Sequence, residues 1–307
     1  MSYRLKKKET ITEGICRVID EQTEQALVAL TESEDQHEGI YDARKCFKRI
    51  RAALRLARPA LGNRYNRENA RYRDAGRRFS EARDAEAMIE TWDALQEWDG
   101  SNLDPNYAAS IREALVERYQ RMIEASNLTS AIEEVVATLE AARAEMHDWP
   151  TLPDKFDTLG DALKKTYRRG RKAMARAYDD PQAEHFHNWR KRVKYSWYHM
   201  RLLQDIWSPL LTSYKEELKN LADTLGDDHD LVVLTELIAQ EPHLFGNARA
   251  RKELCATIAE RQTQLRTEAY FLSQRIYAAP PSALVDMLEQ SWQAWHNETA
   301  DVDLVVL

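Results

Sequence analysis

The chain has 307 residues, of which 43% are hydrophobic and 31% charged, so it is long and apolar enough to bury a sizeable core. Its formal net charge of -7 argues against a general nucleic-acid coat protein, which is normally basic throughout. The three cysteines are far apart and predict neither a disulfide framework nor a metal site. No apolar run is long enough for a membrane span or a secretory signal, so we expect a cytoplasmic protein.

Apolar residues at helical spacing, with prolines near the edges of the periodic segments, predict ten helices in chain order. The predicted helices span residues 10–31, 38–60, 65–98, 105–125, 127–147, 156–178, 182–207, 210–240, 247–278 and 281–296. The long 65–98 and 210–240 segments are candidates for a break, the second near Gly226. No segment alternates like a half-buried strand, so the fold class is all-α, built from packed helical hairpins.

The sequence repeats itself at an offset of 146 residues, where "YDARKCFKRIRAALRLA" aligns with "HNWRKRVKYSWYHMRLL". The aligned cations are Arg44, Lys45, Lys48 and Arg55 with Arg190, Lys191, Lys194 and Arg201. The same offset, without a gap, aligns Arg73 with Lys219 and Asp84 with Asp230. We interpret this register as a duplication within a single domain of residues 1–307. Repeat 1 covers about 1–150 and repeat 2 about 151–307, with the joint near 147–156.

Each copy carries a cationic helix face beside an apolar one, at about 100° per residue. The cationic face of the first copy holds Tyr41, Arg44, Lys48, Arg51 and Arg55, and that of the second holds His187, Arg190, Lys194 and Arg201. Lys45 and Lys191 flank these faces. A third basic segment, 163–176, contains Arg168, Arg169 and Arg171 and no acidic residue. Segments 41–58, 163–176 and 187–201 carry +6, +7 and +5, so the rest of the chain carries -25.

Such segregated charge predicts an anion site. Arg offers a planar fork of donors, Lys a mobile point charge, and a helix face repeats every 5–6 Å, so these side chains can follow a linear polyanion. Arg73 and Lys219 are further candidate ligands. Asp84 and Asp230 are expected to be structural, each orienting one or two arginines. The competing interpretation is a solvated charged face whose cations pair with acids on the next helix.

The pattern His-x-x-Arg-Lys-x-x-Lys on a basic helix, followed by "GDDHDL", resembles the CHAD domain, the conserved histidine α-helical domain. "FHNWRKRVKYSWYHMRLL" and "LADTLGDDHDLVVL" carry the resemblance in the second copy, and "YDARKCFKRIRAALRLARPAL" and "RRFSEARDAEAMIE" in the first. It implies two four-helix-bundle repeats around a basic central groove or pore, binding of inorganic polyphosphate and association with polyphosphate granules. Tyr41 replaces the usual first-copy histidine.

We therefore expect a polyphosphate-binding protein that is not an enzyme and needs no cofactor or metal. The alternatives are a helical protein that binds RNA or DNA, and an enzyme that transfers or hydrolyses phosphate with His187 or a metal on residues 227–230. His187 is expected to contribute to the anion site and, by gaining charge near pH 6–7, to tighten binding in mild acid. An exposed helix face could also support a homodimer.

Overall fold

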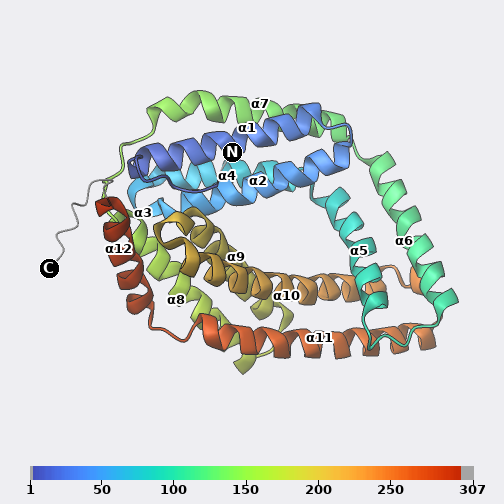
Figure 1. Cartoon of the computed structure of the whole chain (residues 1–307). Helices are drawn as coiled ribbons and strands as arrows, with labels where there is room; N and C mark the ends of the chain where they lie inside the picture. The colour runs from blue at the N-terminus through green and yellow to red at the C-terminus, as the bar shows by residue number, and fades with distance from the viewer. Residues whose placement is uncertain (1–2, 299–307) are drawn as a thin grey trace.

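The computed structural model describes residues 3–298, except for the side chains at 81 and 82, and every regular element in that range is a helix (Figure 1). The predicted all-α class is confirmed. The α-helices are α1 (Ile11–Glu32), α2 (Gln36–Leu56), α3 (Arg58–Leu61), α4 (Asn63–Arg77), α5 (Ser80–Glu97), α6 (Pro105–Ala125), α7 (Leu128–Ala144), α8 (Asp157–Asp179), α9 (Ala183–Leu202), α10 (Ser208–Gln240), α11 (Ala248–Ile276) and α12 (Pro281–Asn297). Short 3₁₀ helices lie at Glu145–Asp148, Gln204–Trp207 and Pro242–Phe245.

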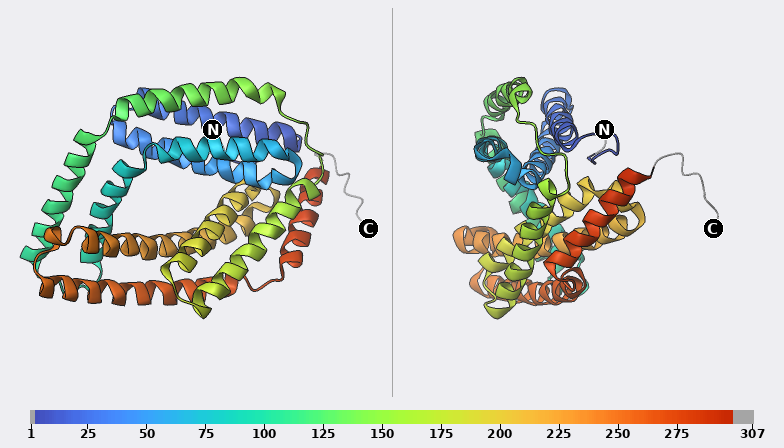
Figure 2. Two further views of the ribbon diagram at one scale, coloured as in Figure 1. Left: turned by 180° about the vertical axis from the view of Figure 1, so that it is seen from behind. Right: turned by 90° about the vertical axis from the view of Figure 1, so that its left-hand side faces the viewer.

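The helices form two layers joined at both ends (Figures 1 and 2). One layer holds α1, α2, α4 and α7, and the other holds α8, α9, α10 and α11. At one end α5 and α6 run from the first layer to the far ends of α10 and α11, and at the other end α12 packs beside α8. In the middle, α2 packs against α9. Within residues 3–298, none of the helices combines the length and the apolar character that a bilayer span requires.

Two apolar clusters form the core, and each draws residues from both halves of the chain. The larger contains Phe47 of α2 and Trp189 of α9, and the smaller contains Trp92 of α5 and Leu234 of α10, all less than 5% exposed. The two halves therefore share their cores and pack as one body.

The helix bounds follow the predicted 146-residue offset. α1 starts at Ile11 and α8 at Asp157, 146 positions later. α2 and α9, which both follow these helices as hairpin partners, end at Leu56 and Leu202, again 146 positions apart. This agreement is consistent with the duplication proposed from the sequence.

The two predicted helix breaks have different outcomes. The 65–98 segment divides into α4 and α5 at Arg78 and Phe79, where the turn places the fully buried Phe79 in the core. The 210–240 segment stays one helix through Gly226. A glycine inside a helix costs about 1 kcal/mol relative to alanine. Packing of the buried α10 residues on both sides of Gly226, such as Leu225 and Leu231, outweighs that cost here. A Cβ at Gly226 would make only an ordinary contact with the guanidinium of Arg190, at 3.6 Å.

The α1–α2 hairpin closes through a contact at Gly39. A Cβ at this position would lie 2.2 Å from the backbone oxygen of Ala29 and 2.9 Å from the Ser33 Cβ. Because a backbone atom is the obstacle, no rotamer change relieves the clash, and the two helices would have to separate.

We predict that Gly39→Ala lowers the free energy of unfolding by about 1–3 kcal/mol, the usual cost of overpacking, in urea titrations followed by circular dichroism. The matched control is Gly76→Ala in α4, where the new Cβ would meet only Phe47 at 3.7 Å. This control should keep or raise stability, because alanine is the better helix former. An equal loss in both variants would contradict the assignment of Gly39 to the hairpin contact.

Candidate anion-binding site

The packing of α2 against α9 brings cations of the two predicted stripes together. We call Arg44 and Lys48 of α2 with Arg190 and Lys194 of α9 the central cluster. The Lys48 side chain keeps a solvent-accessible surface, although many protein atoms lie around its ammonium group. Burial, together with the charges of Lys194, Arg44 and Arg190, lowers the pKa of Lys48 to about 7. Burial and the neighbouring Arg190 lower the pKa of Lys194 to about 8. The stripes therefore converge, as the sequence analysis required of an anion site.

The central cluster is not neutralised by direct ion pairs. None of its four members forms a salt bridge with any carboxylate that the structure describes. Arg44 donates a hydrogen bond to the carbonyl oxygen of Gly76, and the buried Nε of Arg190 has no hydrogen-bond partner among the described residues. Much of the hydrogen-bonding capacity of these donors is therefore unused within the described structure.

Carboxylates face the central cluster at a longer range. Asp84 on α5 acts on Arg44, and Asp230 on α10 acts on Arg190, which repeats the same pair 146 residues later. Burial raises the pKa of both carboxyls, while the nearby cations oppose that rise. Burial and Asp230 also raise the pKa of Asp227 to about 6. Asp84 and Asp230 thus lie where an orienting role was expected, but they act through space rather than through a hydrogen bond.

A cavity of about 450 Å³, the central cavity, opens beside α2 and α9. Its lining residues are Arg44, Phe47, Lys48, Arg51, Arg55, Tyr72, Arg73, Gly76, Arg77, Ser80, Lys191, Arg192 and Tyr195. Eight of these are Lys or Arg and none is acidic. The electrostatic potential inside this cavity is therefore strongly positive.

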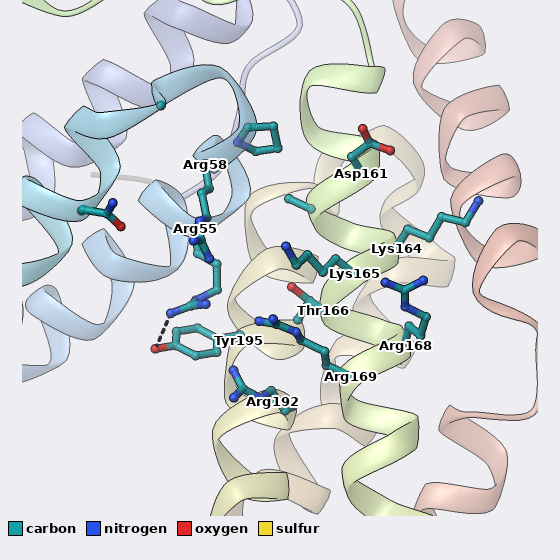
Figure 3. Close-up of a pocket in the computed structure, with 14 residues that line it drawn as sticks. Arg55, Arg58, Asp161, Lys164, Lys165, Thr166, Arg168, Arg169, Arg192 and Tyr195 are labelled. Carbon is teal, nitrogen blue, oxygen red and sulfur yellow. Dashed lines mark hydrogen bonds between the residues drawn. The ribbon is translucent and has the colours of Figure 1, made fainter.

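A second cavity of about 550 Å³, the lateral cavity, adjoins the first (Figure 3). Its lining residues are Arg55, Arg58, Pro59, Gly62, Asn66, Asp161, Ala162, Lys164, Lys165, Thr166, Arg168, Arg169, Arg192 and Tyr195. The two cavities share Arg55, Arg192 and Tyr195. Arg55 lies over the Tyr195 ring at 4.1 Å from its centroid and donates to the Tyr195 hydroxyl at 3.4 Å (Figure 3). Cations from α2, α8 and α9 thus line one continuous path.

The structure does not bring every predicted ligand to these cavities, and Arg190, Lys194 and His187 line neither of them. Lys45 pairs with Asp42 at 3.0 Å, with its Nζ 3.7 Å from the ring centroid of the exposed Tyr41. Arg201 lies between the rings of Tyr3 and Trp197, at 5.4 and 5.2 Å. The side chains of Tyr41, Lys45 and Arg201 also line neither cavity.

Three further predicted ligands are also placed differently. Lys219 pairs with Asp223 at 2.9 Å. Arg73 does line the central cavity, but it pairs with Asp74 at 2.8 Å. Arg171 is exposed on α8 and is not among the residues that line either cavity. Their contribution to binding therefore remains a prediction from the sequence alone.

His187 is placed near the central cluster but in a different charge state from the one expected. Its ring lies against that of His229, with centroids 4.2 Å apart and the ring planes tilted by 36°. Burial, His229 and Lys191 lower the pKa of His187 to about 4. The expected gain of charge near pH 6–7 is therefore wrong, because a pKa of about 4 leaves the imidazole of His187 neutral at physiological pH.

Sequence reasoning missed several residues that line the cavities, among them Arg77, Arg192 and Tyr195. Arg192 and Tyr195 lie three residues apart on a second face of α9, the face toward α8. The three-residue spacing of Arg192 and Tyr195 could have identified this second face, if the helix had been assumed to contact neighbours on two sides. The described residues also include no group of three His, Cys, Asp or Glu side chains placed to hold a metal ion.

Comparison with known proteins agrees with this fold. The family model described as "CHAD domain" matches residues 17–239. A solved structure, the crystal structure of the CHAD domain from the plant Ricinus communis, is similar over 95% of this chain and 94% of that chain, with a TM-score of 0.54 and 20% sequence identity. A comparison with curated proteins gave no match. Because the family model covers well over half of the residues, the chain belongs to the CHAD domain family.

Proposed function

We propose that this protein binds linear inorganic polyphosphate without catalysing its turnover. The observation that carries the proposal is the set of thirteen Lys and Arg that line the two connected cavities, against one acidic residue, Asp161. Eleven of the thirteen form no ion pair with any carboxylate that the structure describes. The other two, Arg73 and Arg77, share Asp74. A row of unpaired donors on several helices suits a chain with phosphate oxygens on every unit.

Nucleic acid fits these cavities less well. The aromatic residues that line them are Phe47, Tyr72 and Tyr195. Phe47 and Tyr72 are at most 2% exposed, and Arg55 covers the face of Tyr195. None of the three offers a free ring on which a base could stack, and base stacking supplies much of the binding of single strands.

Binding of this kind would attach the protein to polyphosphate granules, the association that the family resemblance implies. An enzyme using His187 is the other alternative. It predicts release of free phosphate from the bound chain, which binding alone does not.

Replacing the two central lysines should separate binding from stability. We predict that Lys48→Gln with Lys194→Gln weakens long-chain polyphosphate binding at least about tenfold in isothermal titration calorimetry, because charge-assisted hydrogen bonds are worth roughly 1.5–3 kcal/mol each. The same variant should unfold at an equal or higher temperature at pH 6, since like-charge repulsion is removed. The control, Lys155→Gln with Lys252→Gln, changes net charge equally at exposed sites. An equal loss of affinity in that control would contradict the proposed location.

Binding should weaken as the pH rises from 6 to 9. In the free protein Lys48 and Lys194, with pKa values of about 7 and 8, lose their protons across this range. A bound polyanion favours the charged forms, so it raises both pKa values and takes up protons. Calorimetry in buffers of different ionisation enthalpy should detect this uptake near pH 8. Affinity independent of pH from 6 to 9, or equally dependent in the double lysine variant, would argue against the central cluster as the site.

The ligand class can be tested by titration of long-chain polyphosphate, pyrophosphate and an oligonucleotide at one salt concentration. Polyphosphate should bind most tightly, and by analogy with DNA roughly six ionic contacts give a log–log salt slope of about -5. Equal affinity for the oligonucleotide would favour the nucleic-acid alternative. Free phosphate released in the same samples, with or without Mg²⁺, would favour the enzyme.

A further inference from the structure

The lateral cavity has features of a built site. Its floor includes Ala162 and Thr166, two small and buried residues one turn apart on α8 that leave room for a depression. Seven Lys and Arg line it, and none of the seven forms a salt bridge with a carboxylate that the structure describes. In Figure 3, Lys165 and Arg169 extend from α8 toward the side where Arg55 and Tyr195 lie.

The cations in this cavity come from three helices and repel one another. Besides burial, the nearby charges of Arg55 on α2 and Arg169 on α8 lower the pKa of Arg192 on α9. The buried Nε of Arg55 has no hydrogen-bond partner among the described residues. The fold thus holds three guanidinium groups close together without a counter-charge, which a bound anion would supply.

The cavity has no counterpart in the first half of the chain. At the 146-residue offset, its four α8 cations correspond to α1 residues that are at most 1% exposed. The α1 residues are Val18, Ile19, Gln22 and Thr23, and those of α8 are Lys164, Lys165, Arg168 and Arg169. α7 packs along α1, whereas α12 packs on α8 and on the 3₁₀ helix at 204–207. The first half of the chain therefore has buried core residues on α1 at the positions where the second half has exposed cations on α8.

The lateral cavity forms one end of the path through the two cavities. Asp161, the one acidic lining residue, lies there near the start of α8, whereas the central cavity has none. A carboxylate repels further phosphate units beyond it. The last phosphate of a chain differs from the internal ones, since it carries an additional ionisation near neutral pH and three unshared oxygens. Such a group needs more donors than an internal unit does.

We infer that the lateral cavity binds the terminal phosphate of a polyphosphate chain, whose following units pass Arg55 and Arg192 into the central cavity. The inference rests on the proposed function and adds to it the recognition of a chain end. It assigns Lys165 and Arg169 to the terminal phosphate and the cations that line the central cavity, among them Arg44 and Lys48, to internal units.

The test compares two pairs of substitutions on the same helix. Lys165→Gln with Arg169→Gln removes two cavity cations, and Lys172→Gln with Arg176→Gln removes two exposed cations that line neither cavity. Both pairs change net charge equally. All four side chains are exposed, so both variants should keep the wild-type helical circular dichroism.

The probes are tripolyphosphate, which has two chain ends, and cyclic hexametaphosphate, which carries more charge but has no end. Wild type should bind tripolyphosphate more tightly in calorimetry. The cavity pair should weaken tripolyphosphate binding at least about tenfold and the control pair only slightly, as expected for lost charge-assisted hydrogen bonds. Tighter binding of the ring, or equal losses in both pairs, would overturn end recognition. Normal binding of long chains in that case would leave the proposed function standing, whereas no binding of long chains by wild type would refute both.

Discussion

The close approach of α2 and α9 is the constraint on which the site depends. It forces Arg44 and Lys48 toward Arg190 and Lys194, and like charges oppose that approach. The other faces of the same helices offset the repulsion, because fully burying a side chain such as Phe47 contributes roughly 1.5–3 kcal/mol. The buried His199 adds a direct link, with its Nε2 3.1 Å from the carbonyl oxygen of Ala52. The repulsion remains visible in the lowered pKa values of the two lysines.

The sequence was sufficient to predict the helices. It was also sufficient to predict the orientation of side chains that lie opposite a strongly apolar helix face. Arg44, Lys48, Arg190 and Lys194 belong to this group, since apolar periodicity fixes which way the rest of the helix points. Arg192 could not be found in this way. Its position depends on α9 having a second neighbour, α8, and contacts between helices far apart in sequence leave little trace in local periodicity.

The charge state of His187 illustrates the same limit. Its residue type alone predicts a pKa near 6.5. The neighbouring His229 comes from α10, 42 positions later, and together with burial it favours the neutral ring. Titration behaviour is set by the neighbours and by the loss of water, and neither can be obtained from one helix considered by itself.

The carboxylates around the central cluster affect the charge state of its cations. Asp223, Asp227 and Asp230 lie on α10, and they raise the pKa values of Arg190 and Lys194 against the effect of burial. The central cavity, on the other hand, has no acidic lining residue. The acids therefore help to keep the cations charged at neutral pH without forming hydrogen bonds to Arg190 or Lys194 in the described structure. Arg44 lines the central cavity and is held by its hydrogen bond to the carbonyl oxygen of Gly76, so less of the binding free energy of an entering phosphate chain is spent on ordering this side chain.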